Sequence, residues 1–323
     1  MRVSRLKWVG LALAALLWAP WTLAQPFPSK PLKIVVPFGA GGVADITART
    51  VAQRMAQGLG QAVVVENRPG AGGIVAAEMV AKADPDGHTL LLISNANAVS
   101  ASLFKSLPVD PVQDFAPVSL MGLFDLVILT SAESKFQTLP QVLDYARTQP
   151  GKLNVGSINI GSTQHLTAEL FKSVAKLDAQ VVPYNGTPAV VTALRGGQVD
   201  VAVEVLSPVL PQIRGGVLRP LAVTGTKRSA SMPDVPTARE VGLTQLLSSS
   251  WNGLAVPAKT PKEVVDRLNR EVNLALQDPA VIQRLKELHI EPYPSTPAQA
   301  KDWLQSELTR WAEVIQRAGI PKQ

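Results

Sequence analysis

Short apolar runs that alternate with helical patterns constrain the fold of this chain more than any other feature. The first runs are residues 32–36, 62–66 and 89–94, and helical patterns at 45–58 and 73–83 separate them. A continuous apolar strand between two helices is typical of a parallel sheet that is covered on both faces. The first part of the chain therefore predicts an α/β unit.

The same alternation returns in the middle of the chain. Strands are predicted at 153–157, 180–182 and 199–205, and helices at 162–175 and 187–194. A second series of this kind predicts a second α/β lobe, and the chain is long enough for two domains of ordinary size.

Three further segments indicate how the two lobes are connected. The long apolar stretch at 115–130 is predicted to cross between them. Two helices with one apolar stripe each end the chain, and capping boxes at 260–263 and 296–299 introduce them. We expect these helices to brace the first lobe from outside, so that this lobe is discontinuous in sequence.

The N-terminus has the pattern of an export signal. Three basic residues within positions 2–7 precede an apolar run at 8–19, and residues 22–24 form a small-residue cleavage site. The run is too short to span a membrane, so the pattern predicts a secretory signal peptide that is cleaved after Ala24. The alternative is an uncleaved N-terminal anchor.

Composition excludes several classes of protein. The chain has no cysteine, which rules out disulfide bonds, a lipoprotein anchor and thiolate metal sites. Its formal charge is +6, but no run of Lys or Arg is interleaved with aromatic residues, which argues against nucleic-acid binding. After the first 24 residues, no apolar run approaches the roughly 18 residues that a membrane span needs.

A glycine-rich turn follows the first predicted strand. Gly39, Gly41 and Gly42 stand between this strand and a helix that begins near Asp45. Glycine lets a bound group come close to the backbone, and the first N–H groups of a helix have no partner within the helix. The helix dipole adds positive potential there. The turn is therefore a candidate anion site.

A dinucleotide site is the alternative interpretation of this turn. Residues 39–44 match the pattern G-x-G-x-x-A after a strand, and Glu66 closes the second strand where a ribose-binding acid belongs. Against this, Pro37 and Phe38 separate the strand from the first glycine, and a second glycine-rich turn follows Glu66. Dinucleotide-dependent enzymes are also uncommon among exported proteins.

A second turn of the same kind occurs in the middle of the chain. Ser157, Asn159, Gly161 and Ser162 follow a strand and open the helix at 162–175. If the two turns face each other across a cleft, their N–H groups can hold a carboxylate without an arginine. The alternative is that both turns are only tight connections between strands and helices.

Several separate blocks of sequence, in the same order, give the chain a family resemblance. The chain resembles the solute receptors of tripartite tricarboxylate transporters, also called the Bug family of periplasmic binding proteins. The resemblance runs from about residue 28 to residue 320. Its blocks are residues 28–31, 36–45, 64–73, 84–90, 161–166, 182–186, 196–200 and 233–237.

The resemblance implies a type II periplasmic-binding-protein fold. Such a fold has two lobes, each with a mainly parallel sheet flanked by helices, and a ligand cleft between them. After the signal peptide at 1–24, we expect the first lobe at 25–126 plus 250–323 and the second at 127–249.

The resemblance also implies which residues meet the ligand. The two turns hold a ligand carboxylate with main-chain groups, and the far end of the ligand meets residues of the loop after the third strand and of the second lobe. The expected ligand-binding residues are Phe38, Ala40, Gly41, Gly42, Asp45, Ser94, Asn95, Ser157, Asn159, Gly161, Ser162, Tyr184, Gly186, Thr187 and Glu204. Two of them depart from the family pattern, which usually has Gly in place of Asn159 and often Asp in place of Glu204. Asn tolerates left-handed backbone angles.

The expected function is that of a non-catalytic periplasmic receptor. It captures a small organic acid, such as a di- or tricarboxylate, an aromatic acid or an acidic amino acid. It delivers the acid to the permease subunits of a tripartite transporter or reports it to a sensor kinase. We expect a monomer without cofactor or metal. A hydrolase that uses Ser157 or Ser162 is the enzymatic alternative, although three histidines, no cysteine and no G-x-S-x-G motif supply little catalytic machinery.

Overall fold

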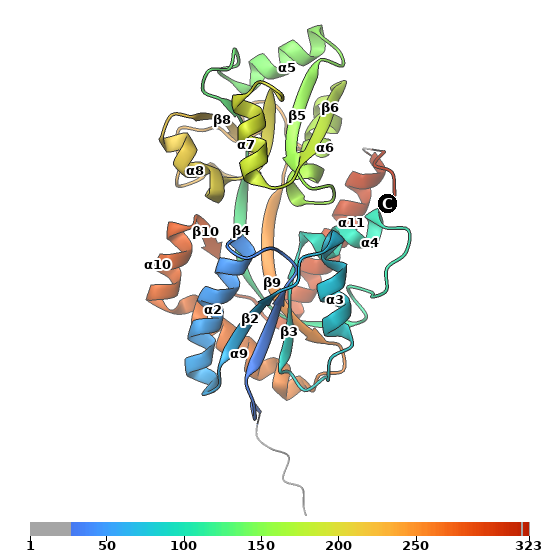
Figure 1. Ribbon diagram of the computed structural model, residues 1–323, viewed down its shortest axis with the longest axis vertical. Helices are drawn as coiled ribbons and strands as arrows, with labels where there is room; N and C mark the ends of the chain where they lie inside the picture. The colour runs from blue at the N-terminus through green and yellow to red at the C-terminus, as the bar shows by residue number, and fades with distance from the viewer. Residues whose placement is uncertain (1–26, 318, 323) are drawn as a thin grey trace, which may run out of the picture.

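The computed structural model describes residues 27–317 and 319–322, so the predicted signal peptide at 1–24 lies outside the described residues. The described chain folds into two α/β lobes, one above the other (Figure 1). Each lobe has strands at its centre and helices around them, as the alternation of apolar runs and helical patterns predicts. The predicted two-lobed α/β fold is confirmed.

Three parallel strands form the edge of the first lobe. β1 (Leu32–Val36) lies in the middle and pairs with β2 (Val63–Asn67) and β3 (Thr89–Ser94). α2 (Val43–Leu59) connects β1 to β2. The short 3-10 turn η1 (Ala71–Gly73) and α3 (Ile74–Ala81) connect β2 to β3. Apart from Lys33, the side chains of β1 are buried, because helices cover both faces of the strand.

Two long strands join the lobes, as Figure 1 shows. β4 (Phe115–Ser131) pairs antiparallel with β9 (Ser249–Pro257) as far as Asp125. From Leu126 onward, β4 pairs with strands of the second lobe. The predicted crossing is therefore confirmed. Because β4 and β9 run antiparallel to their neighbours, the sheets are mixed, in the order β2-β1-β3-β9-β4-β7-β5-β6.

The second lobe repeats the βα alternation of the first. Its parallel strands are β5, β6 and β7, while β8 pairs antiparallel with β4. The strands are β5 (Leu153–Ile158), β6 (Ala179–Tyr184), β7 (Val201–Val205) and β8 (Leu218–Val223). The helices are α5 (Leu139–Thr148), α6 (Thr163–Ala175), α7 (Thr187–Arg195) and α8 (Leu206–Arg214).

The C-terminal helices return to the first lobe. α9 (Lys262–Gln277) packs its buried apolar stripe against α2 and β4, and α10 (Pro279–Glu287) leads into the short strand β10 (Ile290–Pro292). α11 (Pro297–Arg317) contacts both α6 and α4 (Asn95–Leu103). The last helix therefore touches both lobes on the side where α4 and α6 approach each other.

Only one of the two predicted capping boxes forms. At α11, the Thr296 N–H donates to the Gln299 side chain (2.9 Å) and the Gln299 N–H donates to the Thr296 hydroxyl (3.2 Å). At α9 the prediction is wrong, because the Thr260 hydroxyl donates to the Pro257 carbonyl instead (2.7 Å). That helix begins after Pro261 without a side-chain cap.

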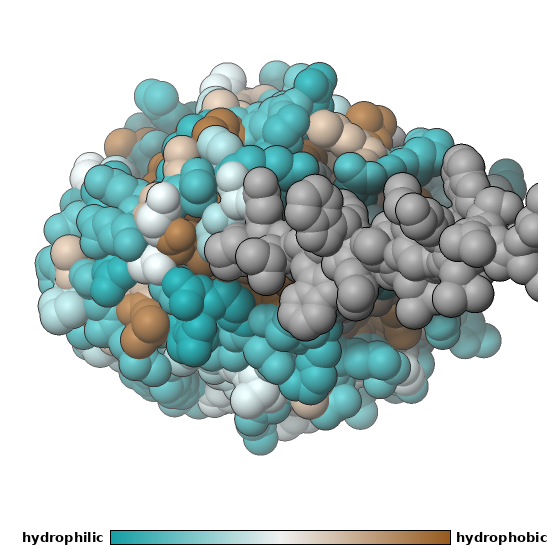
Figure 2. All heavy atoms as spheres, turned by 90° about the horizontal axis from the view of Figure 1, so that it is seen from below, coloured by the Kyte–Doolittle hydropathy of each residue, from teal (hydrophilic) through white to brown (hydrophobic). Residues whose placement is uncertain are grey.

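The far end of the first lobe presents mostly hydrophilic side chains where Figure 2 leaves it in view. Figure 2 shows isolated hydrophobic side chains among hydrophilic ones on this face. Within the described part of the chain, no helix combines the length and the apolar character that a membrane span needs.

Candidate ligand-binding site

A cavity of about 520 Å³ lies between the two lobes. The first lobe contributes the turn after β1, the beginning of α4 and the end of α10. The second lobe contributes the ends of β5 and β7 and the beginnings of three helices. Ser250 and Asn252 of β9 line the cavity between the lobes. The cavity therefore has walls from both lobes and from a connecting strand.

In the described chain, five helices begin at the wall of this cavity, namely α2, α4, α6, α7 and α8. Their N-cap residues are Gly42, Ser94, Ser162, Gly186 and Val205, and all five line the cavity. The first N–H groups of a helix have no partner within the helix, and the dipole makes that end positive. Among the described lining residues, none has a charged side chain. The arrangement suits a small anion.

The first glycine-rich turn is held in shape by Asp45. Its carboxylate accepts hydrogen bonds from the Gly41 N–H (2.9 Å), from Arg49 (3.0 Å) and from the Asn67 amide (2.9 Å). Burial disfavours the charge, but these hydrogen bonds outweigh burial and hold the pKa of Asp45 below its usual range. Gly41 has φ +78°, which only glycine adopts without strain. Asp45 thus shapes the turn from behind and does not line the cavity.

The second turn places Ser162 at the cavity. The Ser162 hydroxyl accepts the His165 N–H (3.1 Å), which caps α6, and donates to the Ile158 carbonyl (3.0 Å). The left-handed residue of this turn is Gly161 (φ 81°), and Asn159 has no positive φ. Asn159 is exposed and Ser157 is buried, and neither lines the cavity.

No loop follows the third strand, contrary to the expectation for Ser94 and Asn95. β3 ends at Ser94, which caps α4 together with Asn97, and α4 begins at Asn95. Ser94 lines the cavity, whereas the Asn95 amide donates to the Thr163 hydroxyl of the second lobe (3.1 Å) and to the Ser249 carbonyl (3.0 Å). Asn95 therefore connects α4, α6 and β9 at the junction of the lobes.

Glu204 lies behind the wall that α6 and α7 form. It is fully buried on β7, and its Oε2 accepts the Thr187 hydroxyl (3.1 Å) and the Gln164 amide (3.5 Å). Thr187 and Gln164 themselves line the cavity. Burial raises the pKa of Glu204 to about 7, although the hydrogen bonds that its carboxylate accepts lower this pKa. Its Oε1 has no partner among the described residues.

Several buried polar atoms around the cavity lack a hydrogen-bond partner in the described chain. They are the Glu204 Oε1, the Asn252 Nδ2, the Asn95 Oδ1 and the Ser157 Oγ. Buried polar groups are normally paired, so water or a ligand is a candidate partner for each of these atoms. Asn252 lines the cavity itself.

The sequence identifies part of the lining. Of the expected ligand-binding residues in the described chain, those that line the cavity are Phe38, Gly41, Gly42, Ser94, Ser162, Gly186 and Thr187. Those behind or beside the lining are Ala40, Asp45, Asn95, Ser157, Asn159, Gly161, Tyr184 and Glu204. The Tyr184 carbonyl accepts the N–H groups of Asn159 and Gly186 and so supports the second turn and the start of α7.

Polar lining residues that sequence reasoning missed lie on α6, α8 and β9. They are Thr163, Gln164, Ser207, Ser250 and Asn252. The first two follow the predicted Ser162 directly, so the helix start was the available signal for them. Ser250 and Asn252 alternate along an apolar strand far away in sequence, and only the fold brings them to the cleft.

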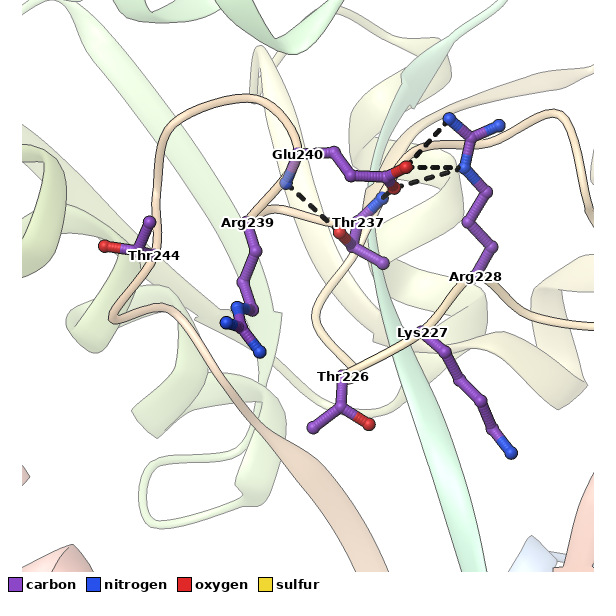
Figure 3. A pocket seen from close by; sticks show the side chains of 7 residues that line it. All are labelled: Thr226, Lys227, Arg228, Thr237, Arg239, Glu240 and Thr244. Carbon is purple, nitrogen blue, oxygen red and sulfur yellow. Dashed lines mark hydrogen bonds and ion pairs between the residues drawn. The ribbon is translucent and has the colours of Figure 1, made fainter.

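A second hollow, of about 590 Å³, is lined by the loop that connects β8 to β9 (Figure 3). Glu240 pairs with Arg228 there (3.0 Å) and accepts the Thr237 N–H (2.7 Å). The side chains of Lys227 and Arg239 point away from this pair (Figure 3). These contacts tie the connecting loop to itself. None of the described residues that line this hollow has an unpaired buried side-chain atom, whereas four such atoms lie around the interlobe cavity, which makes that cavity the candidate site.

The geometry gives no support to the enzymatic alternatives. Glu66, the expected ribose ligand, forms ion pairs with Lys33 (2.7 Å) and Arg68. The Ser157 hydroxyl and the His165 Nδ1 are both without a partner in the described chain, so they do not form a nucleophile–base pair. The described residues contain no cluster of three or more acidic or histidine side chains that could hold a metal.

A two-lobed α/β fold whose cleft is lined by helix N-termini is that of the solute-binding proteins, a class of receptors. A family model described as "Tripartite tricarboxylate transporter family receptor" matches residues 47–320. Protein BugT of Bordetella pertussis is 35% identical over 322 residues, which cover 99% of each chain. The chain therefore belongs to this receptor family, which includes the Bug proteins.

Solved structures agree with this assignment. The structure of R. palustris Rpa4515 with adipate is 32% identical, with a TM-score of 0.84 over 91% of this chain and 99% of that one. MatC from Rhodopseudomonas palustris with bound malate is 34% identical, with a TM-score of 0.80 over 90% and 100%. Both relatives carry a dicarboxylate in their structures.

Proposed function

We propose that this chain is a periplasmic receptor that closes its two lobes around a small organic acid and delivers it to a tripartite transporter permease or to a sensor. The observation that carries the proposal is the convergence of five helix N-termini on a cavity whose described lining has no charged side chain. The acid would contact the first glycine-rich turn, before α2, from one lobe and the second turn, before α6, from the other. Closure then follows, because the full set of contacts exists only when the lobes are together.

The expected contributions to the binding free energy are large enough for micromolar affinity. Each hydrogen bond to a charged group contributes about 1.5–3 kcal/mol, and a partly buried helix terminus adds up to about 2 kcal/mol. Micromolar binding needs about 8 kcal/mol. Four or five such donors reach this value after the cost of ordering the ligand. The proposed signal peptide at 1–24 and the family both support a location in the periplasm.

A thermal-shift screen combined with native mass spectrometry tests the proposal. We expect monocarboxylates, dicarboxylates, aromatic acids and acidic amino acids to include a ligand that raises the midpoint of unfolding, because a ligand of the folded state stabilises it. Native mass spectrometry of the purified protein should show a co-purified acid. If NAD stabilises the protein and no acid does, the receptor proposal fails.

Substitution of Asp45 tests the role of the first turn. We expect Asp45→Asn to weaken acid binding about tenfold, because the amide no longer holds the Gly41 N–H and Arg49 as a carboxylate does. The matched control is Asp278→Asn, which also loses an arginine partner and a backbone N–H, but at the start of α10 and outside the lining. Titration calorimetry should show an unchanged affinity for the control. Equal affinities for both variants would contradict the role of Asp45.

A further inference from the structure

The far side of the cleft contains an acid of the protein itself. Glu204 is completely buried, yet its carboxylate accepts hydrogen bonds from Thr187 and Gln164, which line the cavity. These two side chains stand in the first turns of α7 and α6. Donors that could serve an anionic ligand at these helix ends are therefore already used by an internal carboxylate.

The rest of the lining suits an uncharged ligand body. None of the described lining residues is a Lys, Arg or His, so a second ligand carboxylate finds no cationic side chain there. Much of the remaining wall is apolar, and its larger members are Phe38, Ile46, Phe124, Ile158, Val205 and Leu288. Apolar walls favour a hydrocarbon chain or ring over a second hydrated charge.

We propose that Glu204 selects against a second carboxylate on the ligand, so that the cleft prefers acids whose far end is uncharged. This inference rests on the proposed function, since it assumes that one carboxylate binds at the glycine-rich turns. The charge of Glu204 repels a nearby carboxylate and offsets the positive ends of α6 and α7. A dicarboxylate then binds only when Glu204 takes up a proton.

Proton uptake makes the selection depend on pH. The pKa of Glu204 is raised to about 7 by burial, so the carboxyl is ionised above neutrality. Its side-chain partners Thr187 and Gln164 do not titrate, and its register partner on β4 is Val127. On α6, the titrating side chain next to Gln164 in sequence is His165, and burial lowers the pKa of His165. Above this pKa, the need to protonate Glu204 lowers the affinity for a dicarboxylate about tenfold per pH unit.

Hexanoate and adipate are a matched pair for the test, because both have six carbons and only adipate has a second carboxylate. We expect the wild-type protein to prefer hexanoate at pH about 8, and the ratio of the two affinities to change about tenfold per pH unit above 7. In Glu204→Gln the ratio should be independent of pH, and adipate binding should strengthen about tenfold at pH about 8. Glu204→Asp keeps a titrating carboxyl and should keep the pH dependence.

The outcomes separate the two proposals. If the wild-type protein binds adipate at least as tightly as hexanoate, with a ratio that does not vary with pH, the role of Glu204 is wrong and the receptor proposal stands. If the ratio of the two affinities still depends on pH in Glu204→Gln, the role of Glu204 is likewise wrong. If neither acid binds at millimolar concentration while NAD does, both proposals fail. Urea denaturation of each variant, without ligand, checks that it is folded.

Discussion

We expect Gly41→Val to lower the affinity for organic acids about a hundredfold while the protein stays folded. Gly41 has φ +78°, and a β-branched residue is strained there although no atom would contact its Cβ within 4 Å. Relief of the strain rotates the Gly41 N–H away from Asp45 and moves the start of α2. The loss of two charge-assisted hydrogen bonds, about 3 kcal/mol in total, corresponds to this factor.

The same helix supplies the matched control. Gly60 stands at the other end of α2 with φ +66° and equally open space around its Cβ. Gly60→Val therefore carries a similar backbone strain far from the cavity. Chemical denaturation should show comparable losses of stability for the two variants, and calorimetry should show a loss of affinity for Gly41→Val alone. If both variants bind acids as the wild type does, the turn is only a connection between β1 and α2.

The second large effect concerns stability without ligand. Glu204 has a pKa near 7 in the folded protein and an ordinary value of 4.5 when it is exposed. Between these values the folded state keeps a proton that the unfolded state releases, so the free energy of unfolding decreases as pH rises. The shift corresponds to about 3 kcal/mol, fully lost above pH about 7. We expect Glu204→Gln to remove this loss.

Denaturation by urea at pH about 5 and about 8 measures the effect. The informative quantity is the difference between wild type and Glu204→Gln, because other groups titrate in both proteins. Burial lowers the pKa of His165, which makes stability rise with pH around its ordinary value of 6.5. Burial raises the pKa of Asp125, which makes stability fall as pH rises above its ordinary value of 3.8. These contributions cancel in the difference. A difference that does not change with pH would show that Glu204 is ionised normally in the folded protein.

The strands that stand between polar turns could be predicted from the sequence almost to the residue. β1 and β3 begin and end where the apolar runs do. By contrast, α4 and α8 cannot be predicted from the sequence, because each begins directly at the end of a strand, at Asn95 and Leu206, without an intervening turn. Pro208 and Pro211 also hide the helical character of α8.

The candidate site, too, could be predicted from the sequence only in part. Both glycine-rich turns are local, so the sequence indicates them directly. The composition of the cavity is a tertiary property, because β9 brings Ser250 and Asn252 to turns that lie far away along the chain. The position of Glu204 behind Thr187, and not in the lining, depends on how β7 pairs with β4 and packs under α7.

The proposed anchoring of the acid by main-chain amides at helix starts has a consequence for how such receptors diversify. A backbone donor is present whatever side chain its residue carries, so most substitutions around the cleft leave the anchor for the acid intact. Changes at positions such as Thr187 and Glu204 can then alter which acid fits without first destroying binding. Descendants of one such receptor can therefore acquire new ligands in single steps, each of them through a working intermediate.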